Sequence, residues 1–151
     1  MRTALVALGT AHLALIRFQQ SEACSCFDRC PMPLDWSQGN LQEGLRRFHS
    51  GAFFEAHEHW ESVWLTAQGP EKTFLQALIQ VAASFHHFHR GNRLGSSSLL
   101  RSALRRLDTY PESFAGVALT PLRASIRLWL AALEPPQPSS PPPVPQLQLA
   151  E

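Results

Sequence analysis

The amino-acid sequence predicts an all-α protein: a single bundle of about five helices, built from two stacked helical hairpins plus a C-terminal capping helix. Three observations support this prediction. Apolar residues between positions 36 and 134 recur with the helical period and not with strand alternation. Glycine and proline interrupt the pattern at intervals that suit ordinary helices. A faint internal repeat relates two stretches that lie 40 residues apart.

The expected helices cover residues 40–49, 52–66, 70–89, 94–108 and 121–133. Asn40 suits the N-cap of the first helix and Thr120 suits that of the fifth. Gly51 ends the first helix, and Pro70 suits the first turn of the third.

The repeat pairs Phe48-His49-Ser50-Gly51 with Phe88-His89-Arg90-Gly91. Both copies read as helix, glycine turn, helix, which is the pattern of stacked helical hairpins. Two copies leave chance similarity between helical hairpins open as an alternative.

The two ends of the chain are expected to lie outside the helical domain. Residues 1–35 are predicted to be a poorly ordered N-terminal extension, residues 36–134 the helical domain, and residues 135–151 a Pro-rich disordered tail. Seven of the twelve prolines fall between positions 135 and 145, which favours an extended, solvated segment. Residues 1–20 resemble a signal peptide only weakly.

Composition narrows the classes of partner. Thirteen basic and twelve acidic residues give a net charge of +1, so a nucleic-acid-binding role is not expected. No apolar run is long enough for a membrane span, and no membrane partner is expected. The three cysteines, at 24, 26 and 30, argue against a complete disulfide framework and suit the reducing cytoplasm. An unknown small molecule or protein remains as partner, and oligomerisation is left open.

The second helix carries the main candidate site. Helical spacing puts His57 and Glu61 on one face with the aromatic side chains of Phe54, Trp60 and Trp64. That face is expected to be buried, and a buried carboxylate is costly unless it is paired or binds a metal. His57 and Glu61 are one turn apart and form a normal half-site for a divalent zinc, manganese or iron ion. An internal His–Glu hydrogen bond is the alternative.

The third helix offers candidate partners for this pair. Gln76, Gln80 and His87 share a face with the small residues Ala83 and Ser84. We expect this stripe to face His57 and Glu61, with His87 as the third metal ligand and the glutamines lining the pocket. The alternative is a solvated face. No nucleotide-binding or other cofactor motif is present in the sequence.

Two functions follow from this reading. In the first, a divalent metal or small ligand binds at His57 and Glu61, and a hydrolase-like reaction uses Glu58 as the catalytic base. In the second, the protein is a non-catalytic helical-hairpin interaction module or adaptor, and its His/Glu/Gln cluster is structural. The sequence does not decide whether the protein is an enzyme.

Two segments carry a family resemblance: residues 48–64, which contain Phe54, Ala56-His57-Glu58, Glu61 and Trp64, and residues 74–92. They resemble the domain of unknown function 309 family, and residues 70–74 and 110–111 look like its cyanobacterial and plastid-lineage members. The resemblance implies a small all-helical protein without an established activity. It also implies a suggested metal-binding motif, H-x-x-x-E-x-x-W/Y, which maps onto His57, Glu61 and Trp64.

Overall fold

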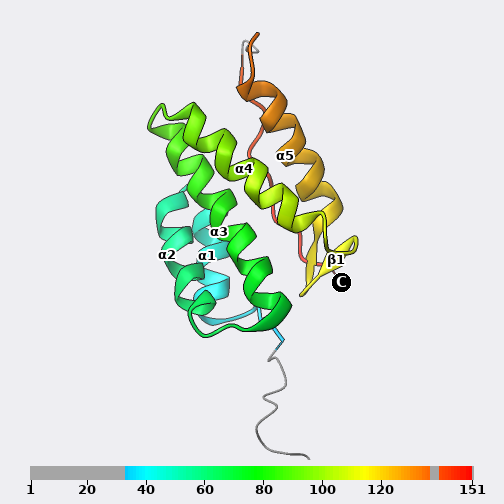
Figure 1. Cartoon of the computed structure of the whole chain (residues 1–151). Coiled ribbons are helices and arrows are strands. Elements are labelled where there is room, and N and C mark those ends of the chain that lie inside the picture. The colour runs from blue at the N-terminus through cyan, green and yellow to red at the C-terminus, as the bar shows by residue number, and fades with distance from the viewer. Residues whose placement is uncertain (1–32, 137–139, 151) are drawn as a thin grey trace, which may run out of the picture.

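The computed structural model describes residues 33–136 and 140–150, and within them the protein is predominantly helical (Figure 1). In chain order the elements are α1 (Gly39–His49), α2 (Phe53–Trp64), α3 (Gly69–His89), α4 (Arg93–Leu107), β1 (Ser113–Phe114), β2 (Val117–Ala118) and α5 (Leu119–Leu133). The expected N-terminal extension falls almost wholly outside the described residues, as do the three cysteines.

The all-α prediction is confirmed, and the helix ends lie within two residues of the expected positions. Two predicted caps are wrong. Asn40 lies inside α1, whose N-cap is Gln38, and Thr120 lies inside α5, whose N-cap is Ala118. The Asn40 side chain instead contacts Nδ1 of His59 on α2 at 3.1 Å, and so links the first two helices.

The helices pack in chain order as two hairpins and a further helix. α1 packs on α2, α2 on α3, α3 on α4, and α4 on α5. Figure 1 shows α3 and α4 side by side in the middle, with the α1–α2 pair flanking one side and α5 the other. This arrangement agrees with the predicted stack of hairpins closed by a C-terminal helix.

A short β-hairpin between α4 and α5 was not predicted. Strands β1 and β2 pair antiparallel through a two-residue turn at Ala115 and Gly116, both with positive φ. Positive φ at both central positions is typical of the turn that matches strand twist, and glycine suits it. The indole N–H of Trp36 donates to the Ala115 carbonyl at 2.7 Å, which fixes the hairpin against the chain before α1.

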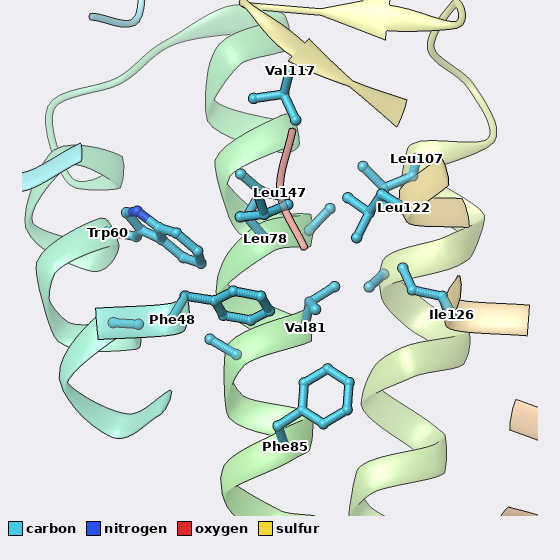
Figure 2. Close-up of a cluster of buried hydrophobic side chains, with 14 of the residues drawn as sticks. Phe48, Trp60, Leu78, Val81, Phe85, Leu107, Val117, Leu122, Ile126 and Leu147 are labelled. Atoms are coloured by element: carbon cyan, nitrogen blue, oxygen red, sulfur yellow. The ribbon is translucent and has the colours of Figure 1, made fainter. Parts of the chain in front are cut away.

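The core is one cluster of buried side chains from all five helices, the hairpin and the C-terminal segment. Figure 2 shows its centre, where Phe48 of α1 and Trp60 of α2 face the α3 residues Leu78, Val81 and Phe85. Aromatic rings join the elements: the Phe53 and Phe85 centroids are 5.2 Å apart, and Phe85 packs edge-on against Trp129 at 5.0 Å. These contacts bury the aromatic content that the sequence concentrates in α1–α3.

Residues 140–150, named here the C-terminal strap, differ from the expected solvated tail. The strap is extended, as its prolines require, but it returns along α5 to the β-hairpin (Figure 1). Leu147 is 4% exposed and lies in the core cluster with Leu78, Val117 and Leu122 (Figure 2). The proline count predicts an extended segment but takes no account of the aliphatic side chains between the prolines, whose burial favours docking.

No helix in the described part of the chain is both long enough and apolar enough to cross a membrane.

Candidate functional site

Helix α2 directs one line of side chains into the core. Phe53, Ala56 and Trp60 are its buried residues, at the i, i+3, i+7 spacing of a single helical face. Trp60 is fully buried, and its indole N–H donates to the Leu41 carbonyl of α1 at 3.3 Å. Trp60 therefore holds α1 and α2 together.

His57 and Glu61 lie at the border of this buried face, not in its middle. Their side chains are 28% and 49% exposed, and His57 Nε2 is 4.0 Å from Glu61 Oε2. The expected burial of the carboxylate is therefore wrong. Because the small Ala56 points inward, the buried arc turns away from His57 and Glu61 by roughly a fifth to a third of a helical turn.

Phe54 extends this border toward solvent. Its side chain is 49% exposed, and its ring stacks on the His57 imidazole with centroids 6.2 Å apart. The ring also contacts His86 of α3, at a centroid distance of 5.3 Å. Phe54, His57, Glu61 and His86 together are named here the α2 edge. It combines an exposed aromatic ring, two imidazoles and a carboxylate.

One ring nitrogen in the α2 edge is unusual. His57 Nδ1 is buried and has no hydrogen-bond partner among the described residues. A buried polar nitrogen without a partner is uncommon in folded proteins, and each instance calls for an explanation. The outward nitrogen, Nε2, points to the Glu61 carboxylate.

The polar stripe of α3 makes its contacts on the other side of that helix. Gln80 accepts from Arg106 at 3.2 Å and donates to Ser102 at 3.5 Å, and both partners belong to α4. His87 Nδ1 contacts the Asn92 side-chain amide at 3.1 Å, and the Asn92 oxygen caps α4 by accepting from the Gly95 amide. The structure therefore does not bring Gln80 and His87 together with His57 and Glu61.

The remaining candidates are dispersed. Glu58 is exposed on α2, and Gln76 is half-buried on α3. Trp64 is half-buried, with the Lys72 ammonium 4.6 Å from its ring centroid. Its indole N–H is buried without a partner in the described chain. Trp64, which lies about one helical turn after Glu61, thus contacts the start of α3.

The chemistry available at the α2 edge is that of a two-ligand half-site. Two ligand atoms that each lie about 2.1 Å from a zinc ion are at most about 4.2 Å apart, so the 4.0 Å separation is compatible with a shared ion at a wide angle. Across residues 33–136 and 140–150, no group of three or more His, Cys, Asp or Glu is placed to hold a metal. A metal-ligating histidine usually donates its other N–H to an acceptor, and His57 Nδ1 lacks one here.

His86 is not among the candidate residues that the sequence pattern indicates. His86 is three residues before His89 and one after Phe85, and these two residues contact Phe53 of α2. A wheel of α3 centred on the buried Phe85 and Ala82 would have placed His86 on the border that faces α2. The signal was present in the apolar pattern, whereas the glutamine stripe pointed to another face of the helix.

The fold and the α2 edge define a class of protein: a small helical-hairpin protein whose second helix shows a His–Glu pair beside an exposed aromatic ring. The model of the domain of unknown function family DUF309 matches residues 41–99. A conserved hypothetical protein from Thermus thermophilus has a crystal structure with a TM-score of 0.55 and 33% identity; the match covers 67% of this chain and all of that one. The chain belongs to the DUF309 family, as the motif resemblance indicated.

A curated relative extends the comparison. An uncharacterized protein of Aquifex aeolicus (strain VF5) is 30% identical over 95 residues, which are 62% of this chain. The matched segment is only 28% of that relative's length. Most of the Aquifex protein therefore lies outside the part that it shares with this chain.

Proposed function

We propose that this protein is a non-catalytic helical-hairpin interaction module that binds a protein partner through the α2 edge. The observation that carries the proposal is the placement of Phe54, half-exposed and stacked on His57 at the surface. Aromatic side chains are enriched in protein interfaces because they bury a large area at a small entropic cost.

The partner's chemistry follows from the groups at the α2 edge. Phe54 offers an apolar face, and the one ion-pair contact of the half-exposed Glu61 carboxylate among the described residues is with the His57 imidazole, at 4.0 Å. A matching surface would place an apolar side chain on Phe54 and a basic side chain beside Glu61. His86 supports the ring from α3, so that the edge spans two packed helices and is held in a fixed shape.

The chain length of the Aquifex relative supports this proposal. In that protein the shared segment is part of a chain more than three times as long as the segment itself. A helical unit that occurs within a longer chain has the character of a module that works together with other protein parts. We therefore propose a protein surface, and not a small substrate, as the partner of this chain.

Site-specific photocrosslinking tests the proposal. A benzophenone amino acid replaces Phe54 in the full chain, in cells that naturally make the protein, and a matched chain carries it at Leu94 of α4, which is more exposed. Position 54 should give a discrete covalent adduct that position 94 does not give. Adding His57→Ala and Glu61→Ala to the position-54 chain should lower the adduct yield about tenfold or more.

The contrary result is equally clear. The same adducts from both positions, or an adduct at position 54 that survives the double substitution, would show that the α2 edge recognises no particular partner.

A second candidate function is divalent-metal binding, which the adjacency of the His57 imidazole and the Glu61 carboxylate one helical turn apart supports. An ion held there would take its remaining ligands from water or from a bound partner. When bound it would supply a Lewis acid, and the exposed Glu58 of the same helix would be the base of a hydrolase-like reaction. His87 enters this proposal only if its ring leaves Asn92.

Elemental analysis tests the metal proposal. The full chain is loaded in turn with zinc, manganese and iron, dialysed without chelator, and compared with the His57→Ala/Glu61→Ala variant. The matched control is Glu55→Ala/His59→Ala, which removes a second Glu/His pair at the same spacing on α2. Metal retained by wild type and control but lost from the first variant supports the site, and equal retention by all three excludes it.

A further inference from the structure

The C-terminal strap lies between two helices that belong to opposite ends of the stack. The Leu147 amide donates to His49 Nε2 of α1 at 3.2 Å, and the Trp129 indole N–H of α5 donates to the Pro143 carbonyl at 2.9 Å. Beneath the strap lie core side chains of α3 and α5, including Leu78 and Leu122 (Figure 2). We name the surface that receives the strap the strap groove: His49, Leu78, Val117, Leu122 and Trp129.

The strap groove holds the strap by main-chain recognition. The Ala118 amide of β2 donates to the Gln148 carbonyl, and the Ala150 amide donates to the Gly116 carbonyl, each at 2.9 Å. Leu149 pairs antiparallel with Val117, so the strap adds a short strand to the hairpin edge. Strand addition of this kind is a common mode of peptide binding, and its hydrogen bonds do not depend on the peptide's sequence.

Side chains supply the selectivity. Pro145 and Leu147 are buried, whereas Gln146 and Gln148 between and after them are exposed, as in an extended peptide on a surface. A tryptophan N–H that donates to a carbonyl within a run of prolines is the contact expected for an extended proline-rich ligand. The strap groove thus combines strand addition with proline-rich recognition.

We propose that the strap groove is a peptide-docking site, which the protein's own strap occupies in cis and which an extended, proline-containing segment of another chain can occupy in trans. The matching segment has a proline at the position of Pro145 and an aliphatic residue at the position of Leu147. Between Pro143 and Ala150 these two strap side chains are buried and Val144 is partly buried against the core, so a competing segment has three side-chain contacts to replace. The proposal goes beyond the α2 edge and does not depend on it.

The occupant in cis lowers the apparent affinity for any segment in trans. A binding site that is open only part of the time binds its ligand more weakly, in proportion to the open fraction. Releasing the strap by a substitution within it leaves the groove residues unchanged. Leu147→Asp places a carboxylate in the core cluster and should release the strap.

Binding of a synthetic peptide of residues 140–150 to the full-length chain tests the proposal by calorimetry and thermal unfolding. The Leu147→Asp chain should bind the peptide about tenfold or more tightly than wild type, because its groove is open. Peptide should also raise its unfolding temperature. The matched control is Leu149→Asp, at a half-exposed strap position, which should behave as wild type does. A peptide carrying Asp in place of Leu147 should not bind either chain.

Two results would overturn the proposal. One is a Leu147→Asp chain that keeps its helical circular dichroism yet binds the peptide no better than wild type. The other is that the Leu147→Asp chain and the milder Leu147→Ser chain both unfold, and that added peptide does not restore their fold. The strap would then be a fixed part of the core.

Discussion

The ionisation state of His49 affects its hydrogen bond to the C-terminal strap. Its Nε2 accepts the Leu147 amide N–H, and a ring nitrogen can accept only while it carries no proton. Partial burial lowers the pKa of His49 below its ordinary value, because the charged ring loses part of its solvation there. The folded protein therefore favours the neutral imidazole that the strap requires.

A dependence of stability on pH follows. In the unfolded chain His49 titrates near its ordinary pKa of about 6.5, and in the folded protein it titrates lower. As the pH falls from about 6.5 through the lowered pKa, the unfolded chain binds more protons at His49 than the folded protein does, so the free energy of unfolding falls. Above this pH window the contribution of His49 to stability is fully present. Urea unfolding at several pH values should show a smaller loss for His49→Gln, whose side-chain oxygen accepts without titrating. Identical losses in both chains would contradict the assignment.

Gly44 of α1 is a second residue with a defined role. A Cβ at this position would lie well inside contact distance of the Trp60 indole, which the core packing fixes in place. Gly44→Ala should therefore lower the free energy of unfolding by about 1–3 kcal/mol, although alanine is the better helix former. Gly39→Ala is no matched control because Gly39 has positive φ; Ser62→Ala, on the exposed side of α2, is preferable and should change stability little. Equal stability of Gly44→Ala and wild type would contradict the close α1–α2 contact.

At the scale of whole elements, the strap is the least conventional part of the fold. It has no helical or extensive sheet pairing of its own within residues 140–150, yet Leu147 is buried in the core and Leu149 is half-exposed. Leu147→Ala should lower the free energy of unfolding by about 2–4 kcal/mol. Leu149→Ala, two residues away, should change it by about 0.5 kcal/mol or less. Chemical denaturation of the full chain measures both, and similar small effects would mean that the strap does not contribute to the core.

The sequence predicts the helices well because glycine and proline mark their ends. Gly51, Gly69-Pro70 and Gly91 all lie at or next to helix boundaries in the structure. Caps were less predictable, because a side chain that could cap, such as Asn40, found a tertiary partner in His59 instead. The β-hairpin was not foreseen, since two-residue strands carry too little periodicity to detect.

The candidate site was predicted in part. The adjacency of His57 and Glu61 follows from helical spacing alone, and the structure has it. Their exposure does not follow from the pattern, because the pattern places the bulky Phe54 on the buried face, whereas the structure exposes Phe54 and buries the small Ala56. The inter-helix position of Gln80 and His87 depends on which face of α3 meets α4, which a single helix pattern does not determine.

At the scale of the molecule, the side chains outside the buried core are divided between two uses. Gln80, Ser102 and Arg106 bond to one another and fasten α3 to α4. By contrast, the α2 edge presents Phe54 and Glu61 to solvent. We infer that the first group serves the fold and the second serves binding.

The free energy of unfolding of α2-edge variants tests this division most directly. Phe54→Ser, His57→Ala and Glu61→Ala are compared with wild type, and Phe53→Ser, at the adjacent buried position, is the control. If the edge serves binding, each of the three should change stability by about 0.5–1 kcal/mol or less, whereas Phe53→Ser should cost about 3–5 kcal/mol. Losses of about 2 kcal/mol or more at His57 and Glu61 would contradict the account, because these side chains would then hold the fold together.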